Sequence, residues 1–218
     1  MDKTRVLIFV LTLLLLEGAC LFYFNLVPIE TGPISYARTD AHQVVDFTPS
    51  FDIQVGENGE LWIDEDPVTA EKLNKIYPRV FSQYGIDFSV NLHIDKDAKM
   101  REVKPIFDAI LKAGGYRVRL VAKRRNSSNC YFMQEINPDN FKSKHVFELS
   151  PEKIKLNGKV VTSDDIENLD LHGMLRDAAL YCDENVTYQR LVDFLSLTRC
   201  RQLQIGPAPS AEPARVNR

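Results

Sequence analysis

Residues 88–122 read FSVNLHIDKDAKMREVKPIFDAILKAGGYRVRLVA and contain the clearest pattern in the chain. Apolar and polar residues alternate over 88–94, which predicts a strand with one buried face. Apolar residues at helical spacing then run from Met100 to Leu111, and Gly114-Gly115 ends that helix. Alternation returns over 116–122 and predicts a second strand. This strand–helix–strand unit favours a sheet with helices packed against it.

Two short strands, over 51–55 and 61–63, are predicted upstream of this unit. Residues 64–67 are predicted to form a turn. Thr69 then caps a predicted helix, which Pro78 should bend or end. The predicted fold class is α+β, with a small sheet and two helices on one of its faces.

A shorter version of the same pattern returns in the second half of the chain. Strand-like segments lie at 147–149 and 154–156, and the hairpin signal Asn157-Gly158 follows them. A strand over 178–182, a helix and a closing strand over 202–205 complete the series. We interpret this as a shortened internal duplication of the first domain.

The N-terminus carries an apolar run from Val6 to Val27, about long enough to cross a ~30 Å hydrocarbon core as a helix. Lys3 and Arg5 precede the run, whereas Arg38 is outnumbered by acids in the residues that follow it. The positive-inside rule then places the N-terminus in the cytoplasm and the bulk of the chain on the far side. We therefore predict one transmembrane helix that anchors a folded domain.

A cleaved signal peptide is the alternative, with Glu17-Gly18-Ala19 as its cleavage site. Glu17 fits the −3 position poorly, and the apolar run resumes at Cys20-Leu21-Phe22. A lipoprotein site at Cys20 is disfavoured for the same reason, so an uncleaved anchor is favoured. The predicted organisation is a membrane anchor over 1–27, a stalk over 28–42, a first domain over 43–122, a connector over 123–145, a second, shortened domain over 146–205 and a disordered tail over 206–218.

Three motifs in the first domain resemble the ExbD/TolR biopolymer-transport proteins. Residues 61–69 (LWIDEDPVT) resemble that family's strand–turn–"DPVT" segment, and 90–97 (VNLHIDKD) resemble its strand ending in "ADK". Residues 103–121 are similar to its helix, "AG" stop and closing strand. The resemblance covers about 51–122 in order, and it continues more weakly over 183–205.

The resemblance implies a single-pass protein of the bacterial inner membrane with a periplasmic domain and a cytoplasmic N-terminus. Such proteins partner an ExbB/TolQ/MotA-like channel, form homodimers and act on a TonB/TolA-like transducer or peptidoglycan. The implied function is an accessory subunit of an envelope transport or stator complex driven by the proton-motive force. The alternative is a membrane-anchored periplasmic scaffold or peptidoglycan-binding module without motor activity.

Glu17, near the middle of the apolar run, is the candidate proton-carrying residue. Members of the resembled family carry an essential aspartate early in their transmembrane helix, within an "IDV"-like motif that this chain lacks. A carboxylate at mid-bilayer costs about 2.5–3.5 kcal/mol on insertion scales, so it faces protein or a water-filled path. There it can bind and release a proton. The simpler interpretation, that Glu17 only bonds a neighbouring helix, stays open.

No catalytic, cofactor or metal site is predicted. The chain has four histidines, His42, His93, His145 and His172. They lie far apart, and none has a second metal ligand at useful spacing. A net charge of -3 with both signs spread along the chain excludes the basic face of a nucleic-acid binder. P-loop, GxSxG and HExxH motifs are missing from the sequence, so an enzyme is not predicted, and a periplasmic hydrolase is the weakest interpretation.

Three further local features are interpreted as structural and not as functional sites. Asp95-Lys96-Asp97 is predicted to supply a helix N-cap, with a binding loop as the alternative. Lys123-Arg124-Arg125 is interpreted as a solvated strand edge, with contact to anionic lipid or cell wall as the alternative. Cys182 and Cys200 are predicted on separate elements, so a disulfide between them is disfavoured.

Overall fold

The structure is a computed structural model, and it describes residues 34–41, 50–63, 66–84, 89–124, 128–137, 143–171, 175, 178–198 and 200–208. These residues all belong to one compact unit, Pro33–Arg218. Among them, no helix is long and apolar enough to cross a membrane. The predicted anchor with Glu17 and most of the predicted tail lie outside the described residues.

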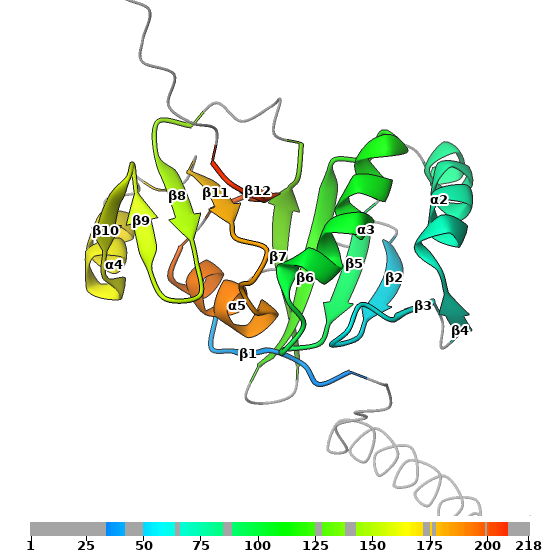
Figure 1. Ribbon diagram of the computed structural model, residues 1–218, viewed down its shortest axis with the longest axis horizontal. Helices are drawn as coiled ribbons and strands as arrows, with labels where there is room; N and C mark the ends of the chain where they lie inside the picture. Colours follow the sequence, from blue (N-terminus) through cyan, green and yellow to red (C-terminus); the bar gives the residue numbers. More distant parts are fainter. Residues whose placement is uncertain are drawn as a thin grey trace, which may run out of the picture. The chain divides into compact units, whose positions relative to one another are not determined.

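Apart from one additional strand, β4 (Asp66–Val68), the elements of the first half follow the predicted order, and the second half has the same series of elements (Figure 1). The first half contains β2 (Ser50–Val55), β3 (Leu61–Ile63), β4 (Asp66–Val68), α2 (Ala70–Tyr84), β5 (Ser89–Ile94), α3 (Met100–Lys112) and β6 (Arg117–Arg124). The second contains β8 (Val146–Leu149), β9 (Ile154–Leu156), β10 (Lys159–Val161), α4 (Ser163–Leu171), β11 (Ala179–Cys182), α5 (Tyr188–Leu197) and β12 (Gln202–Ile205). Two further strands are β1 (Arg38–Thr39), which precedes the first half, and β7 (Asn129–Glu135), which lies between the halves.

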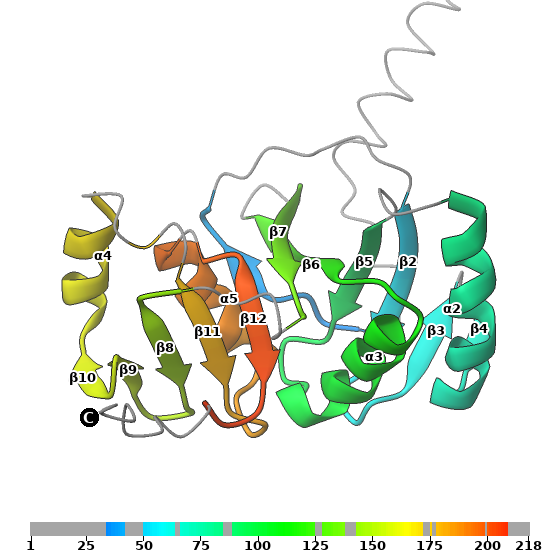
Figure 2. The same ribbon diagram turned by 90° about the horizontal axis from the view of Figure 1, so that it is seen from above.

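All of these strands belong to one sheet, in the order β10-β9-β8-β11-β12-β7-β6-β5-β2-β3-β4 with β1 beside β6 (Figure 2). Within each half the central strands are parallel, and an antiparallel hairpin extends the outer edge. The orders β4-β3-β2-β5-β6 and β10-β9-β8-β11-β12 are therefore the same. β7 joins them, because it pairs antiparallel with β6 and parallel with β12.

The pairing of β7 with β6 and with β12 relates the side-chain faces of the two halves. Glu135 of β7 pairs with Arg117 of β6 and with Gln202 of β12, so these three side chains share one face. The next residues, Val118 and Leu203, are buried on the opposite face. The two helices predicted for the first domain are α2 and α3, and they contact each other.

The predicted hairpin signal in the second half is confirmed. Asn157 and Gly158 both have positive φ values, of 49° and 80°, and they connect β9 to β10. A two-residue turn with both φ values positive matches the twist of the strands that it joins, and Asn-Gly adopts it readily.

One hydrophobic core runs through both halves, and it is closed at the start of α3 and α5. The backbones bridge there: Met100 N–H donates to Val186 O, and Tyr188 N–H donates to Ala98 O, each at 2.9 Å. Tyr188 is fully buried, and its hydroxyl donates to Val121 O of β6 at 3.0 Å. The second half therefore shares its interior with the first.

The predicted connector over 123–145 is wrong, because it contains β7. Every second residue of β7 is buried, namely Cys130, Phe132 and Gln134. Polar residues at both buried and half-exposed positions hide this alternation in the sequence. The strand is therefore recognised only in the folded structure, where it is buried between β6 and β12.

Two local predictions upstream are also corrected. Asp66 and Pro67 were predicted in a turn, yet they pair with Ile63 and Trp62 as part of β4. The helix α2 runs through Pro78 to Tyr84. An interior proline costs about 3 kcal/mol, and here it lies on the exposed face while Leu73 and Tyr77 are buried on the other. The burial of the apolar face outweighs the lost hydrogen bond.

Candidate functional site

The residues that follow the predicted membrane anchor form a strap, residues 34–41, that lies on the folded domain. Ser35 N–H donates to Asp95 Oδ2 at 2.6 Å, and Lys96 N–H donates back to Ser35 O at 2.7 Å. Ile34 and Ala37 of the strap are buried. This end of the strap is therefore fixed to the turn that follows β5.

The other end of the strap is held by β6 and by α5 of the second half. Lys123 N–H donates to Ala37 O at 2.8 Å, and β1 pairs parallel with the end of β6. The amide of Gln189 on α5 clamps the backbone of Arg38: Arg38 N–H donates to Oε1 at 2.8 Å, and Nε2 donates to Arg38 O at 2.9 Å. Thr39 Oγ1 lies 2.6 Å from Ser196 Oγ of α5. The strap thus bonds to both halves of the domain (Figure 1).

Two sequence predictions are corrected by the strap. Residues 34–41 were predicted as part of an extended stalk, but they are seated on the domain by the bonds described above. Asp95 was predicted as a helix N-cap, but the N-cap of α3 is Lys99, which makes no side-chain capping bond. Asp95 instead accepts Ser35 N–H and Asp97 N–H, because its buried carboxylate reaches both backbones.

We expect Asp95→Ala to release the strap. Hydrogen bonds to a charged group contribute about 1.5–3 kcal/mol each. The variant loses two of them, together with the charge that organises the turn. Hydrogen exchange of the Ser35 and Lys96 amides should accelerate by at least about tenfold. The matched control is Asp183→Ala, because Asp183 accepts Asn185 N–H in the same kind of turn after β11. Equal acceleration in both variants would contradict a specific role of Asp95.

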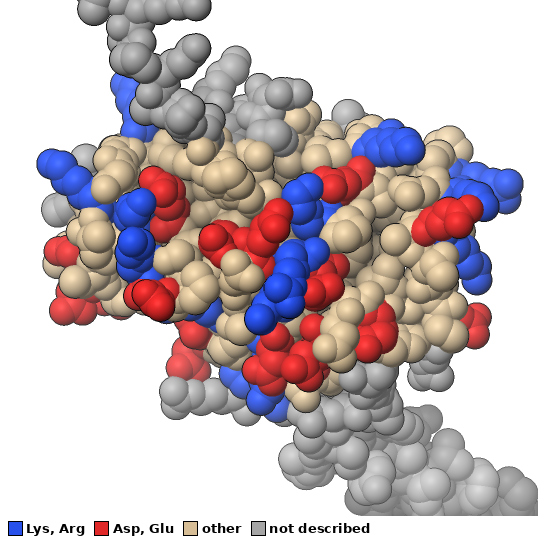
Figure 3. All heavy atoms as spheres, in the orientation of Figure 1, with Lys and Arg blue, Asp and Glu red and all other residues tan. Residues whose placement is uncertain are grey.

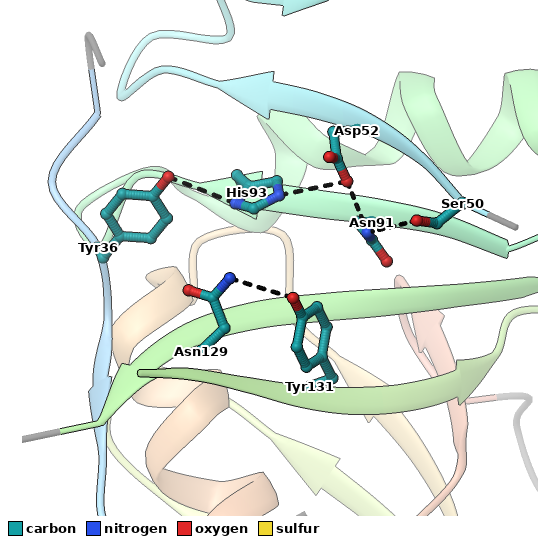
Figure 4. A network of polar contacts seen from close by, with 7 residues as sticks. All are labelled: Tyr36, Ser50, Asp52, Asn91, His93, Asn129 and Tyr131. Carbon is teal, nitrogen blue, oxygen red and sulfur yellow. Dashed lines mark hydrogen bonds and ion pairs between the residues drawn. The ribbon is translucent and has the colours of Figure 1, made fainter. Parts of the chain in front are cut away.

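A polar network connects the strap to the open face of the sheet (Figure 4). The Tyr36 hydroxyl lies 3.4 Å from His93 Nδ1, and His93 Nε2 lies 3.5 Å from Asp52 Oδ1. Asn91 Nδ2 donates to Asp52 Oδ1 at 2.6 Å and to Ser50 Oγ at 3.0 Å. The five residues come from three segments, because neighbouring strands β2 and β5 present every second side chain on this face.

His93 is the central group of this network. Its side chain is 14% exposed, whereas that of Asp52 is 55% exposed. The hydrogen bond from His93 lowers the pKa of Asp52, helped by the bond from Asn91 and by the charges of His93 and Arg119, while burial opposes the shift. The Tyr36 ring packs edge-on against His93 at 5.9 Å and lies under Lys123 Nζ at 4.7 Å. The network therefore connects the strap to Asp52 through His93.

We expect Asp52→Asn to flatten the acid end of the stability profile. A lowered pKa in the folded state stabilises the fold above the ordinary carboxyl value of 3.8, and that contribution is lost as the pH falls through the lower folded value. Wild type should therefore lose more stability than Asp52→Asn between pH 4 and about pH 2. Urea unfolding midpoints at each pH measure this, with Asp164→Asn on α4 as the control. Identical pH profiles for wild type and Asp52→Asn would contradict the coupling.

The network was missed in the sequence. His93 was treated as an isolated surface or core histidine, because its partners Asp52 and Tyr36 lie 41 and 57 positions away. The available signal was the alternation of β2 and β5, which puts Ser50 and Asp52 in register with Ser89 and Asn91.

The other residues singled out in the sequence do not join this network. His42, His172 and Arg125 lie outside the described residues, and the backbone N–H of His145 donates to Ser143 Oγ at 3.1 Å. Lys123, predicted on a solvated edge, holds the strap instead. Within the described ranges, no group of three or more His, Cys, Asp or Glu residues is placed to hold a metal ion. Cys130, Cys182 and Cys200 are free thiols and buried.

Charges of both signs are interspersed on the face seen in Figure 3. Among the described residues, Lys104–Asp108 and Lys155–Glu148 are ion pairs at 2.9 and 3.2 Å. Recognition on this face must therefore come from local groups of residues and not from a broad field of one sign.

Comparison with known proteins agrees with the resemblance found in the sequence. The family model described as "Biopolymer transport protein ExbD/TolR" matches residues 6–125, which is more than half of the 218 residues. The match begins in the predicted anchor and ends after β6. No curated protein and no solved structure matches the chain. Members of the family are accessory subunits of energy-transducing envelope complexes, anchored in the inner membrane. The chain belongs to the ExbD/TolR family of biopolymer transport proteins.

Proposed function

We propose that this protein is an accessory subunit of an envelope transport or stator complex driven by the proton-motive force. Its helix Val6–Val27 sits in an ExbB/TolQ/MotA-like channel partner, and Glu17 carries the proton. The domain lies in the periplasm of a bacterial cell and acts on a TonB/TolA-like transducer or on peptidoglycan. The role is mechanical and requires no catalytic site.

The strap is the observation that carries this proposal. Six residues, 28–33, separate the proposed helix from Ile34, and an extended chain of that length spans at most about 20 Å. The strap then bonds to Asp95, Lys123 and Gln189, in both halves of the domain. In this proposal a rotation or displacement of the helix reaches both halves of the domain through the strap.

The two halves support the further proposal of an internal duplication. Their strand orders are the same, and their helices begin with the same kind of turn, at Asp95 and Asp183. We propose that the protein assembles as a homodimer through its periplasmic domains, so that each channel complex receives two such double domains.

The alternative function is a membrane-anchored periplasmic scaffold or peptidoglycan-binding module. Two observations favour it: the "IDV"-like motif is missing, and residues 126–218 lie outside the family match. In this alternative Glu17 is a packing residue, and the strap only positions the domain near the membrane.

Purification of the full-length protein from native membranes in mild detergent tests the two functions. The accessory-subunit proposal expects a polytopic ExbB/TolQ/MotA-like protein to remain bound. A control preparation in which 1–33 are replaced by the anchor of an unrelated single-pass protein should lose that partner. Recovery of the protein alone, or only with cell-wall fragments, would contradict the proposal and support the scaffold.

A further inference from the structure

The sheet ends in two equivalent edge strands, β4 in the first half and β10 in the second (Figure 1). Each has three residues and closes an antiparallel hairpin with its neighbour, β3 or β9. The central residue of each edge strand pairs with the central residue of that neighbour: Pro67 with Trp62, and Val160 with Lys155. Pro67 and Val160 therefore occupy equivalent positions in the two halves.

The backbone groups of Val160 point away from the sheet. Asn157 N–H donates to Val146 O of β8 at 2.8 Å, so Asn157 faces β8. Successive residues of a strand direct their hydrogen-bonding groups to opposite sides. Leu156 therefore faces β10, where it pairs with Lys159, and the residue after Lys159, Val160, directs its N–H and C=O outward. No described strand lies beyond β10, so these two groups form an open edge.

The edge of the first half is closed, because a proline occupies the outward-facing position. Gly56 N–H donates to Glu60 O at 2.8 Å, so Glu60 faces β2 and Leu61 faces β4. Leu61 pairs with Val68, and the outward-facing residue of β4 is therefore Pro67, which has no N–H. Proline on an edge strand is a common protection against unwanted pairing. Of the two edges, only β10 can both donate and accept.

The side chain of Val160 adds an apolar surface to this edge. It is 67% exposed, and among the described residues it is the one large hydrophobic side chain that is exposed. Val160 shares a face of the sheet with Lys155, whereas Val161 turns to the other face and packs against the core. The open edge thus combines an outward N–H and C=O with an exposed valine.

We propose that β10 is the seam of the homodimer, with β10 of a second copy paired antiparallel to it about a twofold axis at Val160. This inference rests on the proposed homodimer and names the surface that forms it. Val160 N–H donates to the carbonyl of the second copy's Val160, and its own carbonyl accepts the same bond in return. The two valine side chains lie opposite each other on one face and shield one another from water.

The twofold pairing is also complementary in charge. It places Lys159 of each copy opposite Val161 of the other, on the face where the core lies. The helix α4 begins two residues after Val161, and its first turn carries Asp164 and Asp165. Each lysine therefore approaches the acidic helix start of the other copy, and this contact occurs twice by symmetry. Because Pro67 closes β4, the pairing ends at two copies and does not extend into an open chain.

The small size of the seam determines where it forms. Two hydrogen bonds and two valines bury far less than the roughly 1,200–2,000 Å² of a stable free interface. The pairing therefore needs the high effective concentration of two copies held by one channel complex. Dilute copies in detergent, without the channel partner, do not form it.

Disulfide cross-linking of the full-length protein in native membranes tests the seam. A Cys20→Ser background leaves only buried thiols, those of Cys130, Cys182 and Cys200. Paired residues that exchange both hydrogen bonds have Cα atoms about 5.5 Å apart, within the disulfide range of about 4.4–6.8 Å. Under mild oxidation, Val160→Cys should give at least about tenfold more linked dimer than the matched control Pro67→Cys at the closed edge.

A second set of variants tests the register and the outward N–H. Lys159→Cys and Val161→Cys on two co-expressed copies should link to each other, because the seam places these residues opposite one another. Val160→Pro in both copies should abolish that link, whereas Val160→Thr, which keeps the N–H, should preserve it. Because the N–H of Val160 points outward, its loss breaks no bond within the sheet, and circular dichroism confirms that the proline variant keeps its fold.

The results separate failure of the seam from failure of the homodimer. A linked yield of Val160→Cys no higher than that of Pro67→Cys, or an unchanged link in Val160→Pro, overturns the seam. If two differently tagged copies still co-purify from those membranes with the channel partner, the homodimer stands and forms through another surface. If the tagged copies do not co-purify, the homodimer and the seam both fail.

Discussion

The Glu17→Gln variant is expected to lose proton-driven activity while its complex stays assembled. Gln keeps the size and the hydrogen-bonding groups of Glu but does not bind and release a proton. A positioned proton-transfer group contributes on the order of a hundredfold to a rate. Proton flux into liposomes that contain the co-purified complex should therefore fall by about that factor, measured with a pH-sensitive dye under an imposed potential.

Two further measurements separate proton transfer from helix packing at Glu17. Glu17→Asp retains a titratable carboxylate and should keep a substantial part of the flux. The amount of channel partner retained by Glu17→Gln should equal that of wild type. Undiminished flux in Glu17→Gln would sink the proton-carrying role, and loss of the partner would make Glu17 a structural contact between helices.

Tyr188→Ala is expected to destabilise the whole domain by about 3–5 kcal/mol, the range for removing a large aromatic side chain from a core. Tyr188 is fully buried where the two halves meet, and its loss also leaves Val121 O of β6 without the hydroxyl at 3.0 Å. Chemical unfolding of the full-length protein in detergent, monitored by fluorescence, measures the change. The transition should stay single, because one core runs through both halves.

Two variants calibrate the Tyr188 result. Tyr188→Phe keeps the ring and removes only the hydrogen bond, so it should cost about 1 kcal/mol. Val160→Ala on β10 changes a side chain that is 67% exposed and should be nearly neutral. Separate unfolding transitions for the two halves, or a cost for Tyr188→Ala below that of Tyr188→Phe, would contradict the shared core.

Local patterns were sufficient for the regular elements of each half. The alternation in β5 and β6, the apolar stripe of α3 and the Asn157-Gly158 turn depend on neighbours within a few residues. A period of two or of 3.6 residues is set by the backbone itself, so the sequence displays it directly. The resemblance to the ExbD/TolR family rested on the same segments and was confirmed over residues 6–125.

Some predictions that rested on local sequence signals were reversed by tertiary contacts. Pro78 has a clear local meaning, yet the buried face of α2 carries the helix through it. The strand β7 has the alternation of a strand, but its polar residues concealed it until burial between β6 and β12 gave it partners. In both cases the energy of packing exceeds the local preference of the backbone.

The sequence by itself determined the strand–helix–strand unit, because periodicity sets it, whereas the anchor lies outside the described residues and stays a prediction. Only the tertiary structure decided where the strap lies and which side chains surround His93. These features join residues far apart in the chain, such as Arg38 and Gln189, which are 151 positions apart. Contacts at that separation form only when the whole sheet has assembled, so no local pattern announces them.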